Sequence, residues 1–313
     1  MARRLEGLFL RVAAALCCCF PHARFRETAG ILAALSLALG ASTSALAQKQ
    51  AGKGNTAPSR ILLAVNEGGA VNADAMETVF RFADFGQVVE KTLRMPVTII
   101  PARDRNAVLA GVQRQAFTLL LARPNDVPAQ AVRDFGYVPV VTEKVPAQVL
   151  FIVRKDSPLR SITDVKGKTF VTPDQYSNIW RMANALLRDN KISFSNENVR
   201  AMRDQAAIGW SMENGFFDVG VVNSVSAVGR TWEKNGGRVL ARGPETPNMP
   251  LIASPQLSAA QIAKLRAALI ALDSSDDGKA LLKKIGLTGF KETSPKVFLD
   301  FLSWLGELEV AKQ

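Results

Sequence analysis

The sequence predicts an α/β protein of two lobes, each with a mostly parallel sheet, joined by two extended hinge crossings. Short runs rich in Val, Ile and Leu alternate with helical segments in residues 61–135 and again in residues 169–241. This pattern is typical of parallel strands that helices cover on both faces. Between the two series, residues 138–141 and 148–154 are two extended stretches that lie too close together for a crossover helix. The Pro-rich residues 243–250 make a second extended link, so we expect a cleft between two α/β units.

The first series is defined by its hydrophobic periodicity. Residues 76–93 carry apolar side chains at helical spacing, including Val79, Phe82 and Val89, and Pro96 precedes the next apolar run. The predicted strands of this series are residues 61–65, 97–100 and 117–121, and the predicted helices are residues 76–93, 105–113 and 128–135.

The second series and the C-terminal part follow the same periodicity. The predicted strands are residues 169–172, 198–202, 218–222, 238–241 and 251–254, and the predicted helices are residues 177–188, 205–213, 224–234, 258–272, 277–285 and 294–308. Ser258 is a predicted helix N-cap, and Gly286 ends the helix before it. We assign residues 59–150 and 248–313 to lobe 1 and residues 151–247 to lobe 2.

The N-terminal segment has the pattern of a secretion signal. An apolar run at residues 30–40 follows Arg24 and Arg26 and precedes Ala45-Leu46-Ala47, an A-x-A cleavage pattern. The run is shorter than the ~20 apolar residues that span a bilayer. We predict a signal peptide over residues 1–47, a flexible segment over residues 48–58, and a soluble protein exported to the periplasm.

Removing this signal changes the chemistry that the chain can offer. Cys17, Cys18, Cys19 and His22 all precede the predicted cut, so the remaining 266 residues hold no cysteine or histidine and carry a net charge of +8. Cys–His and Ser–His–Asp catalysis and His-ligated zinc are thereby excluded. We expect neither a cofactor nor enzymatic activity, although two carboxylates such as Glu67 and Asp174 would leave an enzyme possible.

The positive charge does not indicate nucleic acid as a partner. Lysines and arginines are scattered along the chain without interleaved aromatic residues. We interpret them as a solvated surface that attracts anionic solutes.

Polar residues follow the apolar runs, where an open α/β sheet places its ligand. The candidate ligand-binding residues are Asn66, Glu67, Arg123, Thr172, Tyr176, Ser177, Asn178, Arg203, Asn223 and Ser224. Their hydroxyl, amide and guanidinium groups suit a small polar ligand, and an anion better than a cation.

Two of these positions have alternative explanations of about equal weight. Ser177 begins a predicted helix, whose unpaired N–H groups bind anions, yet it is equally a simple N-cap. Arg123 follows three leucines and either binds an anion bidentately or pairs with a nearby carboxylate. Asp218, by contrast, is expected to bond to local backbone N–H groups.

Four segments carry a family pattern. Residues 149–170 read VLFIVRKDSPLRSITDVKGKTF, residues 215–222 read GFFDVGVV, residues 247–250 read PNMP, and residues 269–290 end in IGLTGF. These segments resemble periplasmic substrate-binding proteins of ABC importers, and most closely the phosphate/phosphonate-binding group. The resemblance covers nearly the whole chain after residue 47. It implies the type II two-lobed fold, hinge closure around a ligand, and a permease of the inner membrane as partner.

The chain departs from the phosphonate-binding pattern at the second-lobe helix start. Members of that group typically carry a Ser-Thr-Ser-Gly-like run there, whereas this chain has Tyr176-Ser177-Asn178-Ile179-Trp180. The expected ligand is therefore a phosphonate, a phosphate or a similar oxyanion or organic acid, bound by a monomer. A ligand-sensing subunit of a signalling system on the same fold is the alternative.

The export hypothesis predicts the mass of the protein that reaches the periplasm. Intact-protein mass spectrometry of the exported fraction should give the mass of a chain that starts at Gln48, because cleavage follows Ala47. A mass that includes the three cysteines of the leader would contradict it.

Overall fold

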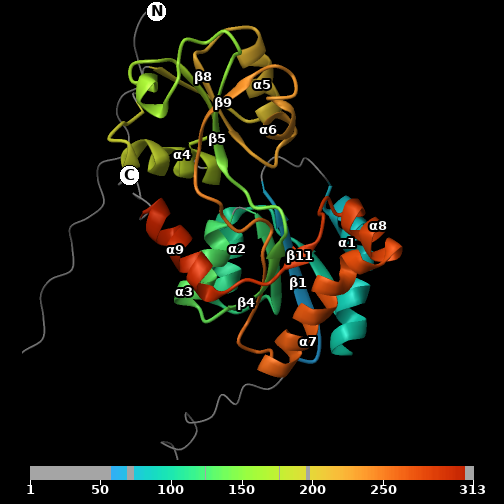
Figure 1. Ribbon diagram of the computed structural model, residues 1–313. Helices are drawn as coiled ribbons and strands as arrows, with labels where there is room; N and C mark the ends of the chain where they lie inside the picture. Colours follow the sequence, from blue (N-terminus) through green and yellow to red (C-terminus); the bar gives the residue numbers. More distant parts are fainter. Residues whose placement is uncertain (1–57, 69–73, 124, 176, 195–197, 307–313) are drawn as a thin grey trace, which may run out of the picture. The chain divides into compact units, whose positions relative to one another are not determined.

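The computed structural model describes residues 58–68, 74–123, 125–175, 177–194 and 198–306 (Figure 1). The predicted signal peptide and Tyr176 lie outside the described residues. No helix in these described ranges is long and apolar enough to cross a membrane.

Six strands form the first sheet, in the order β11-β4-β10-β3-β1-β2. Their bounds are Ile61–Glu67 (β1), Val97–Pro101 (β2), Leu119–Arg123 (β3), Val138–Glu143 (β4), Leu251–Ala253 (β10) and Phe290–Lys291 (β11). Strand β1 pairs in parallel with β2 and β3, whereas β10 is antiparallel to both β3 and β4. Two antiparallel steps restore direction, so β4 runs the same way as β3.

Helices cover both faces of this sheet, which explains the continuous apolar character of its central strands. Leu63 and Val65 of β1 join one buried cluster with Phe82, whereas Ala64 joins the other with Leu120. The helices that pack with the first sheet are α1 (Ala75–Leu93), α2 (Arg105–Gln113), α3 (Asp126–Asp134), α7 (Ala259–Ile270), α8 (Asp276–Lys284) and α9 (Pro295–Leu305).

Five strands form the second sheet, in the order β7-β6-β8-β5-β9. The bounds are Val149–Val153 (β5), Phe170–Pro173 (β6), Val199–Met202 (β7), Val219–Asn223 (β8) and Arg238–Arg242 (β9). Strand β6 is parallel to β7 and β8, and β5 is antiparallel to β8 and β9. The helices that pack with the second sheet are α4 (Asn178–Asp189), α5 (Gln205–Glu213) and α6 (Ala227–Thr231).

The α/β fold class is as predicted, but strand direction is more mixed than expected. In each sheet, parallel strands occupy one part and antiparallel pairs the other. The crossings cause the mixture. The chain leaves β4 at the carboxyl edge of the first sheet and enters β5 directly, without the helix that would return it to the opposite edge.

The positions of most predicted elements agree with the structure within about two residues, but two predicted helices are shorter and one strand was not predicted. The helix predicted over residues 294–308 ends at Leu305, before Gly306 with a positive φ of 77°. The helix predicted over residues 224–234 is shorter in the structure, where α6 spans Ala227–Thr231. A turn on each side limits it: the N–H of Ser226 donates to the carbonyl of Asn223, and the N–H of Gly237 donates to the carbonyl of Trp232. The two-residue strand β11 was not predicted, since so short a run has no periodicity. Ser258 caps α7 through its side chain, as predicted.

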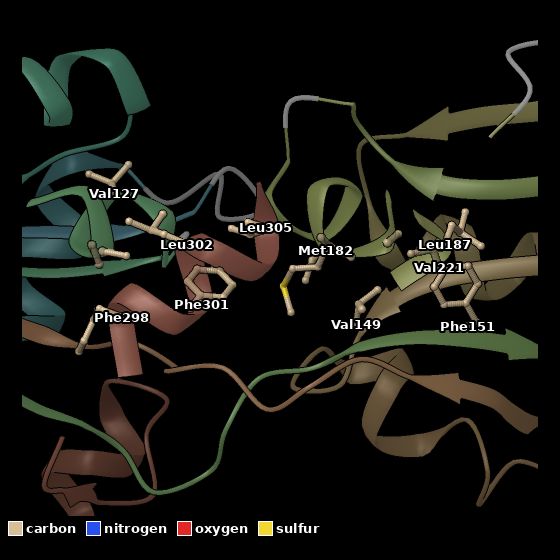
Figure 2. Packing of buried hydrophobic residues seen from close by; sticks show 14 of the residues in the cluster. Val127, Val149, Phe151, Met182, Leu187, Val221, Phe298, Phe301, Leu302 and Leu305 are labelled. Carbon is tan, nitrogen blue, oxygen red and sulfur yellow. The ribbon is translucent and has the colours of Figure 1, made fainter. Parts of the chain in front are cut away.

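Helix α9 joins the buried residues of the two sheets. Figure 2 shows Phe301, Leu302 and Leu305 of α9, with Val127 of α3 beside Leu302 and Met182 of α4 on the other side. These residues belong to one continuous hydrophobic cluster that reaches Phe151 and Val221 of the second sheet. The core is thus shared between the sheets through α9.

Truncation of Phe298, a fully buried side chain of α9, should destabilise the whole chain. Phe298→Ala is expected to lower the free energy of unfolding by about 3–5 kcal/mol, because it removes buried area and leaves a cavity. Val297→Ala, at an exposed position of the same helix, is the matched control in urea unfolding and should change stability little. Equal stability losses in the two variants would contradict this account of the core.

Candidate functional site

The carboxyl edge of the first sheet brings Glu67 and Arg123 side by side. They are register partners on β1 and β3, as are Asn66 and Ala122. Asn66 is buried, and its Oδ1 accepts a hydrogen bond from the N–H of Gly68 at 2.8 Å. The carboxylate of Glu67 pairs with Arg81 of α1, so Glu67 holds the strand end to the helix.

Arg123 is fixed from one side by the second crossing. Its Nε donates to Oδ1 of Asn248 at 3.1 Å, and its Nη2 lies 3.6 Å from Oε2 of Glu143. Asn248 also donates through Nδ2 to Glu143 and to the carbonyl of Val145. The Arg123 side chain remains 32% exposed. A guanidinium has five N–H donors, so donors remain for a ligand after these contacts.

Burial dominates the electrostatics of this edge. It raises the pKa values of Glu67 and Glu143, and the charge of Arg123 opposes both shifts. Burial likewise lowers the pKa of Arg123, against the attraction of Glu143 and Glu67. Arg230, on helix α6 beside the second sheet, also lowers the pKa of Arg123. The positive charge of Arg230 therefore acts on the edge of the first sheet where Arg123 lies.

The second sheet places two unpartnered polar atoms near the start of α4. Thr172 is fully buried at the end of β6, and its Oγ1 has no hydrogen-bond partner among the described residues. It shares the α4 side of the sheet with Phe170, two residues earlier. Ser177 caps α4 by accepting from the N–H of Trp180 at 3.1 Å, while Oδ1 of the neighbouring Asn178 is buried and also without a described partner.

The remaining predicted residues divide between structural and exposed positions. Ser224 accepts through Oγ from the N–H of Gln148 at 2.9 Å, which ties the end of β8 to the first crossing. Oδ1 of Asn223 accepts from the N–H of Val225, and its N–H donates to Gln205. Arg203 is exposed after β7. Asp218 accepts from the N–H and hydroxyl of Thr169, so its role is structural as expected, although Thr169 lies 49 residues away and is not a local partner.

An ion pair joins the carboxyl edges of the two sheets. Arg181 of α4 contacts Asp126 of α3, with 2.7 Å between Nη1 and Oδ2. Helix α3 follows β3, and α4 follows β6. The edge that carries Arg123 therefore faces the edge that carries Thr172.

Sequence reasoning missed the residues that connect these edges. Asp126, Glu143, Arg181 and Asn248 were not among the candidates, because each partner lies far away in the sequence. A weak sequence signal existed for Asn248, since it lies in the Pro-rich second crossing between Pro247 and Pro250.

Of two surface hollows, one is too small for a ligand and the other lies away from the predicted residues. The first, of about 20 Å³ among Asn66, Glu67 and Arg103, has room for about one water molecule. The second, of about 200 Å³, lies by Arg154, Lys155 and Trp232 at the opposite edge of the second sheet, away from the predicted residues. No group of three or more metal-ligating side chains occurs among the described residues.

A family profile matches most of the chain. The profile described as "ABC transporter, phosphonate, periplasmic substrate-binding protein" covers residues 69–298. Among curated protein sequences, none matches.

Solved structures share the fold at low sequence identity. The XAC2383 protein from Xanthomonas citri, bound to ATP, is 15% identical, with a TM-score of 0.62 over 79% of this chain and 97% of that chain. PhnD1 from Prochlorococcus marinus, in complex with methylphosphonate, is 17% identical, with a TM-score of 0.57 over 79% and 97%. A binding protein component of an ABC phosphonate transporter from Pseudomonas aeruginosa is 16% identical, with a TM-score of 0.56 over 77% and 83%.

The buried carboxyl of Glu143 gives a testable dependence of stability on pH. Its folded-state pKa is raised above 4.5, so its stabilising contribution is present below that pH and is lost as the pH rises through the folded pKa. Glu143→Gln lacks this contribution. In urea unfolding between about pH 4.5 and about pH 7, the stability of the parent relative to the variant should therefore fall with rising pH.

Glu213→Gln, at an exposed carboxylate of α5, is the matched control. A constant or rising difference for Glu143→Gln would contradict the assignment of burial as the main influence on this group.

Proposed function

Because the chain belongs to the phosphonate-binding family of periplasmic substrate-binding proteins of ABC transporters, we propose that it closes around a small oxyanion and delivers it to an ABC permease. Phosphonate and phosphate are the leading ligands. In this proposal the two lobes are residues 59–150 with 248–313 and residues 151–247, and the protein acts in the periplasm after cleavage near Ala47.

The observation that carries the proposal is the pair of unpartnered polar atoms beside α4. A buried hydroxyl or amide without a hydrogen-bond partner costs about 1–3 kcal/mol, so it is retained where a ligand completes it. Thr172 Oγ1 and Asn178 Oδ1 both lie by a helix start, and such a start favours anions. The Thr172 hydroxyl can donate to an oxyanion, and Asn178 can accept from a protonated oxygen of the ligand.

Arg123 supports the same proposal from the first sheet. Its contacts to Asn248 and Glu143 hold one side of the guanidinium, and its other donors remain free to form charge-assisted hydrogen bonds to an anion. Arg230 adds a second positive charge to this region. An anion between the two sheet edges would relieve the repulsion between these arginines.

The tetrahedral oxyanion is the ligand class shared by several structures with this fold. PhnD1 binds methylphosphonate, and SsuA from Escherichia coli, with a TM-score of 0.50 at 16% identity, is an aliphatic sulphonate binding protein. Hydroxyl, amide and guanidinium donors suit any such group, and the bulkier Asn178-Ile179-Trp180 favours a small one. Transport is the role proposed, and the family gives no reason to expect turnover.

Thr172→Val tests this function because it removes a hydroxyl that has no described partner. Isothermal titration calorimetry with methylphosphonate, phosphate, methanesulfonate and acetate should show binding of at least one tetrahedral anion by the parent. The variant should bind that anion about ten-fold more weakly or worse, since one hydrogen bond to a charged group is lost. Its thermal stability should not fall.

Thr118→Val is the matched control, because the Thr118 hydroxyl accepts from the N–H of Leu62 within the first sheet. This variant should lose stability and keep its affinity. Unchanged binding by Thr172→Val, or no heat with any of the four anions, would contradict the proposal.

A further inference from the structure

Asp126 is a buried carboxylate that two arginines from different parts of the fold share. Its Oδ2 accepts from Nε and Nη2 of Arg105 at 3.2 and 2.6 Å and from Nη1 of Arg181 at 2.7 Å. Arg105 opens α2 and belongs with the first sheet, whereas Arg181 lies on α4 of the second. Only the contact with Arg181 therefore crosses between the two sheets.

The ion pair between Asp126 and Arg181, which joins the two sheets, is largely shielded from water. Asp126 is 1% exposed, and the side chain of Arg181 is 13% exposed. Arg105 already pairs with Asp126 within the part of the fold that carries the first sheet, so Asp126 keeps a partner when the edges separate. The contact with Arg181 adds a further charge-assisted hydrogen bond that exists only while the edges touch, and it therefore favours that arrangement.

Helix α4 connects this pair to the proposed ligand. Arg181 lies one turn after Ser177 and Asn178, on the helix whose start is proposed to hold the anion. The same arginine donates through Nη2 to the carbonyl of Gly306, just after α9, at 3.3 Å. Arg188, two turns further along α4, donates to the carbonyl of Trp304 at 2.7 Å. Helix α4 is thus fastened to α3 and α9 together.

We infer that Asp126 is a positioning residue that acts through Arg181: their ion pair latches the ligand-binding helix α4 to the other lobe and favours the closed form before any ligand binds. This inference rests on the proposed two-lobed binding function. The ligand selects the closed form, and its apparent affinity falls in proportion when fewer molecules are closed. The latch therefore increases affinity without touching the ligand.

The distance between the lobes tests the latch directly. The only cysteines of the chain are Cys17, Cys18 and Cys19, so the full chain with these replaced by serine accepts two spin labels at Lys91→Cys and Lys234→Cys, both exposed positions. Double electron–electron resonance without ligand should show longer distances in Asp126→Asn and in Arg181→Gln than in the parent. The double variant should open no further than Arg181→Gln, because that single variant already lacks the ion pair between Asp126 and Arg181.

Arg105→Gln is the matched control, since it removes the ion pair of Arg105 with the same carboxylate without breaking the contact between lobes. Its distances should equal those of the parent, and Arg181→Lys should restore part of the short-distance population by retaining a cation. If Asp126→Asn fails to fold, Arg181→Gln alone decides. Unchanged distances in Arg181→Gln, or an equal shift in Arg105→Gln, would overturn the inference.

Titration with methylphosphonate separates this result from the proposed function. Both the latch and the proposed site are supported if methylphosphonate returns the open variants to the short distance with an affinity weakened in proportion to their open fraction. If the variants open and the parent binds none of the four anions, the latch stands and the proposed ligand class fails.

Discussion

The direction of the strands at the two crossings constrains the rest of the structure. One crossing leaves the carboxyl end of β4 and enters β5, and the other leaves β9 and enters β10. Both therefore connect the carboxyl edges of the two sheets. The crossings are also bonded to each other, through the bridge of Ala147 with Thr246 and the bond from Nε2 of Gln148 to the carbonyl of Gly243. Residues at the strand ends are thereby brought to a common region.

This constraint explains why so many charged groups are buried at one place. Glu143 ends β4 beside the first crossing and Arg123 ends β3, and Asn248, which precedes β10 in the second crossing, is hydrogen-bonded to both. Each charge has a partner, as the cost of burying an isolated ion requires. Among the buried atoms without a described partner, the hydroxyl of Thr172 and the amide oxygen of Asn178 are those that the proposed ligand would satisfy.

Local sequence signals predicted the elements well and the contacts poorly. The bounds of α2 and α5 and the N-caps Ser177 and Ser258 depend on neighbouring residues, and all agree with the sequence analysis. Asp218 has a structural role, as expected, but its partner Thr169 lies 49 positions away in the sequence. Strand ends could likewise be identified, which is why Thr172 and Arg123 were candidates. The pairings of Arg123 with Glu143 and of Arg181 with Asp126 join residues 20 to 55 positions apart in different elements, and periodicity carries no information about them. Ser224, another candidate chosen for its place at a strand end, accepts a hydrogen bond from the first crossing, which its position in the sequence did not indicate.

A crystal structure of the protein grown with methylphosphonate tests the central claim most directly. The account predicts an anion between the two sheet edges, with its oxygens hydrogen-bonded to Oγ1 of Thr172 and to backbone N–H groups at the start of α4, and with Arg123 on its other side. A methylphosphonate bound instead in the hollow by Arg154 and Lys155, with the hydroxyl of Thr172 still unpartnered, would contradict it.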